Sequence, residues 1–505
     1  MTQTPIQTLG IVGTGLMGRG IAQIAAQAGI ATLMFDANPG AAGKARENIG
    51  ETLAKLVDKG KLTAAQREAT MQNLQPVDAL AKLAACDVVI EAIVEDLAAK
   101  QALFKALEEV VRDDCIIASN TSSLSVTAIA SACKRPGRVG GFHFFSPVPL
   151  MKLVEVIGGV QSEPRVTDTL LSLGQRMGHT AVRAADTPGF IVNHAGRGYG
   201  TEALRVLSEG VASFDAIDRI LKDGAGFRLG PFELLDLTGL DVSQPVMESI
   251  YHQYYEEPRF RPSPLLLQRK TAGLLGRKTG RGFYTYVDGV PQPVPQSVAP
   301  SARPALVWIS GRHPDAHSKV LHLAAALGAK IDAGLRPTDE SLCVVTPLGT
   351  DATTAAVDEQ LDAMRTVAID AWFGLALHRT LMTTPITAPA MRDAAHGLFA
   401  VDQVPVSVIQ DSAGFVSQRV VAHIVNVACD IAQQRIATPQ DVDRAVTLGL
   451  GYRQGPLAMG DALGPKNVLA ILNSLHGFYG DPRYRASPWL TRRARLGVSL
   501  LTPDS

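Results

Sequence analysis

The chain has 505 residues, which at about 150 residues per domain corresponds to three or four domains. Its 48 Lys and Arg residues balance its 48 Asp and Glu residues, and no long run of one sign occurs. This balance excludes the charge patterning typical of nucleic-acid and membrane-surface proteins, so an anionic ligand has to be bound by local groups.

The sequence carries no targeting or membrane signal. The N-terminal residues lack a basic stretch followed by an apolar one, and no run reaches the roughly 18 apolar residues of a spanning helix. The cysteines show no CxxC pair and no ligand-like spacing to histidine. We therefore expect a cytoplasmic protein without a bound metal, in which the five cysteines are reduced, small buried side chains: Cys86, Cys115, Cys133, Cys343 and Cys429.

The first motif along the chain is a glycine-rich turn. Residues 9–12 form an apolar run that leads into GTGLMG, and apolar residues then recur at helical spacing up to Gly29. A second apolar run, 31–35, ends in Asp36, 18 residues after Gly18. Strand, turn, helix and acidic residue at this spacing predict a dinucleotide site, and the carboxylate favours NAD over NADP. A tight turn without a ligand is the simpler alternative. The candidate cofactor contacts in the turn are Gly13, Gly15, Leu16, Met17 and Gly18.

Three further apolar runs predict strands whose carboxyl ends meet at one edge of a parallel sheet. The runs are 86–93, 115–119 and 138–145. Ligands of open parallel sheets bind at this edge. The polar residues that the runs carry to it are Glu95, Asn120, Ser122 and His143.

His143 lies in the stretch GFHFFSPVPLMKLVEVI. A histidine in an apolar run is either a buried structural residue or a general base, and the position at the ligand edge favours the general base. Glu155 would fix the ring tautomer and stabilise the imidazolium if the two side chains met. Pro147 and Pro149 favour a turn that returns residues 152–156 as a strand beside the first, so we predict that His143 and Glu155 touch.

From Thr187 the pattern changes to helical segments separated by glycine turns, which predicts a mainly helical domain. Five prolines between residues 291 and 304 indicate a stiff, extended linker. The residues that follow, up to 405, contain apolar runs at 305–309 and 342–346 but no GxGxxG. We expect a small α/β segment there, a decayed relative of the first domain.

The chain also contains an internal repeat at a shift of 225 residues. DTPGFIVN, which begins at Asp186, matches DSAGFVSQ, which begins at Asp411, and GFRLGP at 226 matches GYRQGP at 451. In the second copy Gln418 replaces Asn193 and no His–Glu pair precedes it, so we expect this copy to keep packing and to lose catalysis. The predicted α/β chain thus has four segments: an NAD-binding Rossmann domain (1–186), a helical substrate or dimerisation-type domain (187–290), the linker with the small α/β segment (291–405), and the second helical copy (406–505).

Seven motifs, taken in order, resemble the NAD-dependent L-3-hydroxyacyl-CoA dehydrogenases in their long bacterial form with two helical C-terminal domains. The motifs are GTGLMG, IEAIVED, ASNTSSL, GFHFFSPVPLMKLVEVI, DTPGFIVN, GPFELLDLTGLD and GRKTGRGFY. They cover residues 13–284, and the rest resembles the family through the second copy. The resemblance implies an oxidoreductase that oxidises the 3-hydroxyl group of an (S)-3-hydroxyacyl-CoA thioester with NAD, in phenylacetate catabolism or short-chain fatty acid metabolism. It leaves open whether the acyl group is 3-hydroxybutyryl, 3-hydroxyadipyl or longer.

The resemblance also implies roles for single residues. His143 would be the general base and Glu155 its orienting partner, and Ser122 and Asn193 would contact the reacting part of the substrate. His194 stands where an arginine is common in the family, which implies that the domains pack differently here.

For the cofactor, the resemblance places Asp36 at the adenosine ribose. Around the nicotinamide half it places Glu95, Lys100 and Asn120. On the helix expected over residues 41–59, Thr52 and Lys59 fall near positions that contact coenzyme A, and a solvated face is the alternative for the lysines of this helix.

In short family members two helical domains pair across a dimer, so the tandem copy implies an internal pseudo-dimer, and a further homodimer stays open. Another β-hydroxyacid dehydrogenase, of the 6-phosphogluconate or 3-hydroxyisobutyrate type, is the alternative enzyme. Those enzymes use a catalytic lysine and lack HFFSPVPLMKLVE. A non-catalytic structural relative, such as the lens crystallin of the family, is the alternative from another class, and the presence of all four catalytic candidates weighs against it.

Overall fold

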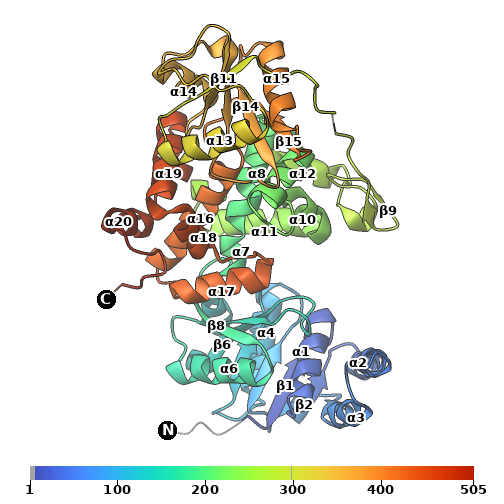
Figure 1. Cartoon of the computed structure of the whole chain (residues 1–505). Coiled ribbons are helices and arrows are strands. Elements are labelled where there is room, and N and C mark those ends of the chain that lie inside the picture. The colour runs from blue at the N-terminus through green and yellow to red at the C-terminus, as the bar shows by residue number, and fades with distance from the viewer. Residues whose placement is uncertain (1–5, 297, 505) are drawn as a thin grey trace. The chain divides into compact units, whose positions relative to one another are not determined.

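The computed structural model describes residues 6–296 and 298–504 and divides into two compact units, and many of their elements are labelled in Figure 1. The first unit contains Met1–His194 together with Gln434–Gly451, and the second contains Ala195–Gln433 together with Tyr452–Ser505. Residues 1–5, 297 and 505, which belong to the predicted Rossmann, linker and second helical segments, lie outside the described residues.

The first unit is built on an eight-stranded sheet of order β3-β2-β1-β4-β5-β6-β7-β8. Neighbouring strands are parallel except β6 and β7, which are antiparallel. This order confirms the predicted Rossmann fold. The strands are β1 (Thr8–Val12), β2 (Ala31–Phe35), β3 (Leu74–Pro76), β4 (Val88–Glu91), β5 (Ile116–Ser119), β6 (Val139–Phe144), β7 (Leu153–Gly158) and β8 (Thr180–Ala185). The helices between them are α1 (Leu16–Gln27), α2 (Ala41–Asp58), α3 (Ala64–Gln72), α4 (Leu97–Glu108), α5 (Val126–Ala130) and α6 (Pro164–Arg176).

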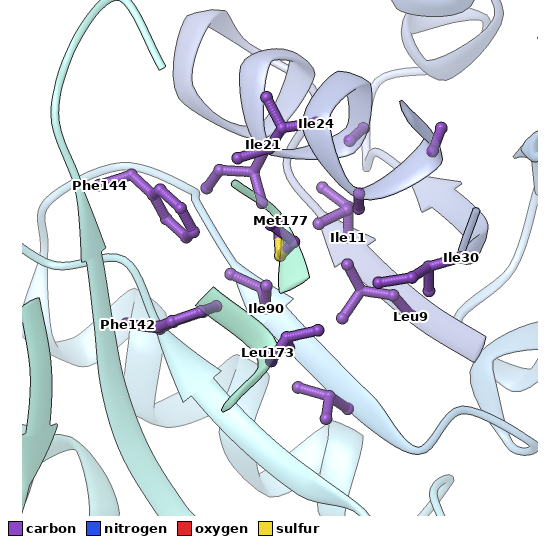
Figure 2. Packing of buried hydrophobic residues seen from close by; sticks show 14 of the residues in the cluster. Leu9, Ile11, Ile21, Ile24, Ile30, Ile90, Phe142, Phe144, Leu173 and Met177 are labelled. Atoms are coloured by element: carbon purple, nitrogen blue, oxygen red, sulfur yellow. The ribbon is translucent and has the colours of Figure 1, made fainter. Parts of the chain in front are cut away.

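Apolar side chains from the central strands and the covering helices fill the interior of this unit. Figure 2 shows Leu9 and Ile11 of β1 gathered with Ile21 and Ile24 of α1 in one cluster. All four are at most 3% exposed. Burying one such side chain contributes about 1.5–3 kcal/mol, so this core holds the strand ends that carry the polar residues of the candidate site.

The elements predicted in this unit are confirmed to within two residues at either end. The returning strand after the Pro147–Pro149 turn is β7, and it pairs with β6 so that His143 stands directly opposite Glu155. The prediction contains no counterpart of α3, β3, α5, α6 or β8. β8 alternates buried and exposed residues, a weaker signal than the uniformly buried central strands give.

One helix of the second repeat copy belongs to the first unit. Helix α17 (Pro439–Leu450) packs against β7 and β8, and the chain just before it joins β8, where Ala185 N donates to the Ile436 carbonyl at 2.8 Å. A Cβ on Gly449 would lie 2.8 Å from Val192 Cγ2, so only glycine allows this close approach. The C-terminal part of the chain thus buttresses the region that carries Glu155.

The second unit combines helices from both repeat copies with the small α/β segment, as the predicted fold class requires. The first copy supplies α8 (Arg197–Ser208), α9 (Phe214–Arg219), α10 (Pro231–Thr238), α11 (Leu240–Gln253) and α12 (Pro264–Thr271), after the short α7 (Val192–Ala195) in which the chain passes from one unit to the other. The second copy supplies α16 (Ser417–Gln433), α18 (Pro456–Leu463), α19 (Pro465–Tyr479) and α20 (Pro488–Leu496). A two-stranded ribbon of β9 (Tyr286–Val287) and β10 (Val290–Pro291) precedes the linker.

The small α/β segment has its own five-stranded sheet, of order β11-β12-β13-β14-β15. Its strands are β11 (Leu306–Ile309), β12 (Ser341–Val345), β13 (Thr366–Ile369), β14 (Arg379–Thr383) and β15 (Val406–Ile409), and its helices are α13 (Pro314–Ala326), α14 (Ala352–Asp358) and α15 (Pro389–Phe399). The first two strands confirm the predicted runs. In the linker, the described residues 292–296 and 298–305 are in no helix or strand.

Candidate active site

The glycine-rich turn forms a cradle at the N-terminus of α1. Gly13 has φ 91°, and a Cβ on Gly18 would lie 1.8 Å from the Gly13 carbonyl oxygen, so the turn tolerates no side chain there. Gly15 is the N-cap of α1, has no side-chain capping bond, and has open space beside it. The helix therefore presents uncapped amides and the positive end of its dipole, as a pyrophosphate requires.

Asp36 closes the far side of this cradle. Its Oδ2 accepts hydrogen bonds from Thr14 N at 2.8 Å and Thr14 Oγ1 at 2.9 Å, and its Oδ1 accepts one from Asn38 N at 3.0 Å. Burial acts to raise the pKa of Asp36, but these hydrogen bonds outweigh it and hold the pKa below its ordinary value. A fixed, ionised carboxylate beside an open glycine turn fits the ribose of NAD.

His143 and Glu155 are in contact, which confirms the prediction drawn from the stretch that joins them. His143 Nδ1 lies 2.7 Å from Glu155 Oε2, and the two residues are 5% and 0% exposed. Because a carboxylate only accepts, this contact assigns the proton of the neutral ring to Nδ1 and leaves Nε2 as a proton acceptor.

The other oxygen of Glu155 is held by the backbone. Its Oε1 accepts hydrogen bonds from Ile191 N at 3.0 Å and Val192 N at 2.9 Å. The turn that aims these amides needs Gly189 at φ 76° and Phe190 at φ 45°. Sequence reasoning did not identify the two amides, and the only signal for them is the Pro-Gly pair that opens this turn.

Aromatic rings flank His143 on the same edge of the sheet. The ring of Phe145 lies 4.5 Å from the imidazole, centroid to centroid, and that of Phe190 lies 5.8 Å away. These rings limit the rotation of the imidazole and exclude water from part of its surface, so the ring is held in one orientation.

Asn120, Ser122 and Asn193 lie near the strand end that carries His143, and each makes a different hydrogen bond. Asn120 Oδ1 accepts from Phe144 N at 2.9 Å and so ties the end of β5 to the strand of His143. Asn193 Nδ2 lies 3.5 Å from the Ser122 carbonyl oxygen. Ser122 and Asn193 therefore meet beside the His–Glu pair.

Glu95 organises the loop that presents Ser122. Its Oε1 accepts from Thr121 Oγ1 at 2.7 Å, from Ser122 N at 2.8 Å and from Ser123 N at 3.0 Å. Burial acts to raise the pKa of Glu95, but the charge of Lys100 and these hydrogen bonds outweigh it and lower the pKa.

Lys100, predicted near the nicotinamide, is 1% exposed, and its ammonium group pairs with glutamates of the protein. Its Nζ lies 2.6 Å from Glu91 Oε1 and 3.3 Å from Glu95 Oε2. Glu91 also accepts from Ser119 Oγ at 2.7 Å. Sequence reasoning gave Glu91 no role, although a glutamate inside an apolar strand signals a buried partner.

The two predicted coenzyme A contacts lie on and just after α2. Thr52 and Lys59 are both exposed, and the hydroxyl of Thr52 donates to the Asn48 carbonyl within the helix at 2.9 Å. Helix α2 buries Ile49 and Leu53 on its other face, so the face that carries Thr52 and Lys59 is open to a ligand or to solvent.

The structure of residues 6–296 and 298–504 also bears on membrane spans and metal sites. No helix there is long and apolar enough to cross a membrane. No group of three or more His, Cys, Asp or Glu side chains in that part of the chain is placed to hold a metal ion.

Comparison with known proteins gives consistent matches. A family model described as 3-hydroxyacyl-CoA dehydrogenase, NAD binding domain, matches residues 8–187, and one described as 3-hydroxyacyl-CoA dehydrogenase, C-terminal domain, matches residues 189–286 and 414–499. The chain is 38% identical over 493 residues to the 3-hydroxyadipyl-CoA dehydrogenase of Escherichia coli strain K12, covering 97% of this chain and 98% of that protein. It is 41% identical to a probable 3-hydroxybutyryl-CoA dehydrogenase of Bacillus subtilis, covering 56% of this chain and 98% of the relative. Among solved structures, that of 3-hydroxybutyryl-CoA dehydrogenase from Escherichia coli K12 is similar with a TM-score of 0.86 and 36% identity, over 98% of this chain and 99% of the other.

Proposed function

Because the chain belongs to the 3-hydroxyacyl-CoA dehydrogenase family, we propose that it oxidises the 3-hydroxyl group of (S)-3-hydroxyacyl-CoA thioesters to a ketone. The observation that carries the proposal is the 2.7 Å contact between His143 and Glu155 at the carboxyl edge of an NAD-binding sheet. A strand edge with a positioned base and convergent polar groups is the arrangement that alcohol oxidation needs.

In this proposal, Nε2 of His143 takes the proton of the 3-hydroxyl group. Glu155 stabilises the resulting imidazolium through Nδ1, and the Ile191 and Val192 amides keep the carboxylate in place. Ser122 and Asn193 orient the reacting part of the thioester. General base catalysis of this kind contributes about 10²- to 10⁴-fold.

The glycine turn and Asp36 would hold NAD, which would supply the redox chemistry as the acceptor of the hydride from C3. The residues of this chain fit the cofactor at its pyrophosphate and ribose. Glu95 and Asn120 act near the nicotinamide half by shaping the strand ends. Lys100 supports Glu95 from inside the protein.

The repeat supports an internal pseudo-dimer of the two helical copies, which we also propose. Helix α8 of the first copy packs against α16 of the second, and a Cβ on Gly198 would lie 3.1 Å from Ile424 Cα. Gly198 and Ile424 stand in corresponding helices of the repeat, so this close approach joins like surfaces, as in a two-fold dimer. A mass measurement in solution tests whether two whole chains also form a homodimer. The five cysteines contain no CxxC pair, and this scattered usage favours the cytoplasm as location.

A direct kinetic comparison of two thioesters identifies the acyl group of the substrate. The E. coli relatives are named for 3-hydroxyadipyl-CoA and 3-hydroxybutyryl-CoA. We expect NADH oxidation with acetoacetyl-CoA, which establishes the reaction class, and a higher kcat/KM for 3-hydroxyadipyl-CoA than for 3-hydroxybutyryl-CoA if the role is in phenylacetate catabolism. Equal values would contradict a dedicated phenylacetate role. Binding of NADH and thioester without turnover would make the chain a non-catalytic relative.

A further inference from the structure

The five-stranded sheet of the second unit repeats the half of the first sheet that carries His143. Strands β11 to β15 have the order and directions of β4 to β8: two parallel pairs, one antiparallel pair and one parallel pair. An aspartate just beyond each last strand performs the same task, Asp186 directly after β8 and Asp411 two residues after β15. Asp186 accepts from Val126 N and Thr127 N at the start of α5, and Asp411 accepts from Ala352 N and Thr353 N at the start of α14.

This correspondence fixes which residues of the second sheet take the catalytic positions. The ladder Ser119–Gly141–Ile157–Ala184 of the first sheet aligns with Val345–Ala368–Met382–Ile409 of the second. Two residues further along, Asp370 stands at the position of His143 and Thr380 at that of Glu155. Gln418 takes the position of Asn193, and Trp372 that of Phe145.

These substitutions replace the base by Asp370, and the side chain of Gln418 is hydrogen-bonded to it. Gln418 Nε2 donates to Asp370 Oδ1 at 3.1 Å and to the Pro347 carbonyl at 3.2 Å, and Gly349 N donates to Gln418 Oε1 at 2.8 Å. Burial raises the pKa of Asp370 to about 7. Among the described residues, Asp370 Oδ2 has no hydrogen-bond partner, so one buried oxygen of this carboxyl group is left unsatisfied.

A cavity of about 410 Å³ opens beside this second strand edge, within the second unit. Its walls include Asp315 and Lys319 of α13, Trp372 and Phe373 after β13, and Gln454 and Asn467 of the second helical copy. The Lys319 Nζ lies 6.0 Å from the centre of the Trp372 ring. This volume is at the lower end of the range for small-molecule sites.

The lining selects the chemistry of the occupant. One lysine and one aspartate balance in charge, two side-chain amides can both donate and accept, and two aromatic rings offer apolar faces. The segment lacks a GxGxxG turn and the β1-α1-β2 half that would hold a pyrophosphate, so a dinucleotide is excluded. An uncharged arm with amide groups and a short acyl chain matches these walls.

We infer that this cavity is a second, non-catalytic site for the acyl-pantetheine end of a thioester. It lies beside the position that corresponds to His143, which it adjoins through Trp372. The inference rests on the proposed function, because it assumes that the original site of the repeat held the same kind of ligand. The second site binds the thioester without turning it over, since it has neither His143 nor a cofactor cradle.

The test uses the full-length protein and butyryl-CoA, a thioester without a 3-hydroxyl group. Equilibrium dialysis should give two molecules bound per chain, and the titration should quench tryptophan fluorescence to a plateau. Ala462, an exposed residue of the cavity wall, offers a blocking variant. Ala462→Phe should reduce the stoichiometry to one, weaken the quenching titration by at least about tenfold and leave acetoacetyl-CoA turnover unchanged. Ala272→Phe, a matched change at an exposed residue outside the cavity lining, should keep two.

One molecule bound per wild-type chain, or two bound to Ala462→Phe, would overturn the inference. These outcomes are separable from the fate of the proposed function. Turnover with a stoichiometry of one keeps the enzyme and removes the second site. Quenching that is sensitive to Ala462→Phe, in a chain without turnover, keeps the second site and removes the enzyme.

Discussion

Replacing His143 by alanine is expected to lower kcat for NADH oxidation with acetoacetyl-CoA by about 10²- to 10⁴-fold. The reaction in this direction needs a proton for the new hydroxyl group, and the proposed donor is the ring that Glu155 holds at 2.7 Å. NADH binding should change little, because the glycine turn and Asp36 belong to other strand ends. Steady-state kinetics and an NADH fluorescence titration measure both quantities.

His252 provides a matched control for this variant. It also contacts a glutamate, with Nδ1 at 2.9 Å from Glu256 Oε1, but both side chains are more than half exposed. His252→Ala should therefore leave kcat unchanged. A His143→Ala enzyme with kcat within about threefold of wild type would remove the histidine from the mechanism, since such a factor is worth less than 1 kcal/mol.

The second large effect concerns the buried ion network of the second unit. Arg419 is 0% exposed and lies 2.9 Å from Glu202 Oε1 and 2.6 Å from Glu209 Oε2, while Arg483 lies 3.1 Å from Glu202 Oε2. Replacing Arg419 by methionine leaves Glu202 buried with half of its charge partners. We expect the free energy of unfolding to fall by about 3–5 kcal/mol.

Denaturant unfolding followed by tryptophan fluorescence measures this loss, because Trp308, Trp372 and Trp489 all lie in the second unit. The control is Arg312→Met, which breaks a half-exposed pair with Asp358 at 3.4 Å and should cost less than about 1 kcal/mol. Equal losses for the two variants would mean that the buried network adds nothing to the stability of this unit.

The same network makes the free energy of unfolding depend on pH in the acidic range. Burial acts to raise the pKa of Glu202, but Arg419 and Arg483 outweigh it and lower the pKa below the ordinary 4.5. The contribution of the ionised carboxylate is therefore complete above pH 4.5 and is lost as the pH falls below that value. The Glu202→Gln variant should show a flatter loss of stability over this acidic range than the wild type.

Arg419 stands in the second copy where His194 stands in the first. At a shift of 225, the residue that corresponds to His194 is Arg419, so the second copy carries an arginine at this position. Its guanidinium binds Glu202 of α8 from the first copy. An arginine of the second copy thus pairs with a glutamate of the first and stabilises the packing between the two copies.

Much of the candidate site was predictable because its signals are local. The glycine turn, Asp36 and His143 each stand in short patterns whose geometry follows from strand ends and helix starts. The contact with Glu155 followed from the proline turn, since an antiparallel return brings opposite residues onto one face.

The rest depended on contacts between segments that the sequence does not mark. The Ile191 and Val192 amides reach Glu155 only because the chain turns at Gly189, and backbone donors leave no residue-type signature. The membership of α17 in the first unit joins residues more than 250 positions apart. The five-stranded sheet shares its strand order and directions with β4 to β8, and these pairings carry the relation to the first domain that the sequence suggested only through Asp411 and the repeat.

The most direct test of the His143–Glu155 dyad compares kcat of wild type, His143→Ala, Glu155→Gln and the double variant with acetoacetyl-CoA and NADH. A glutamine can present an N–H group to Nδ1, which would shift the ring to the wrong tautomer, so Glu155→Gln alone should be slow. If Glu155 acts through His143, the double variant is no slower than His143→Ala, because residues that act as a unit are non-additive. Losses that multiply in the double variant would contradict the dyad and show that Glu155 acts independently of the histidine.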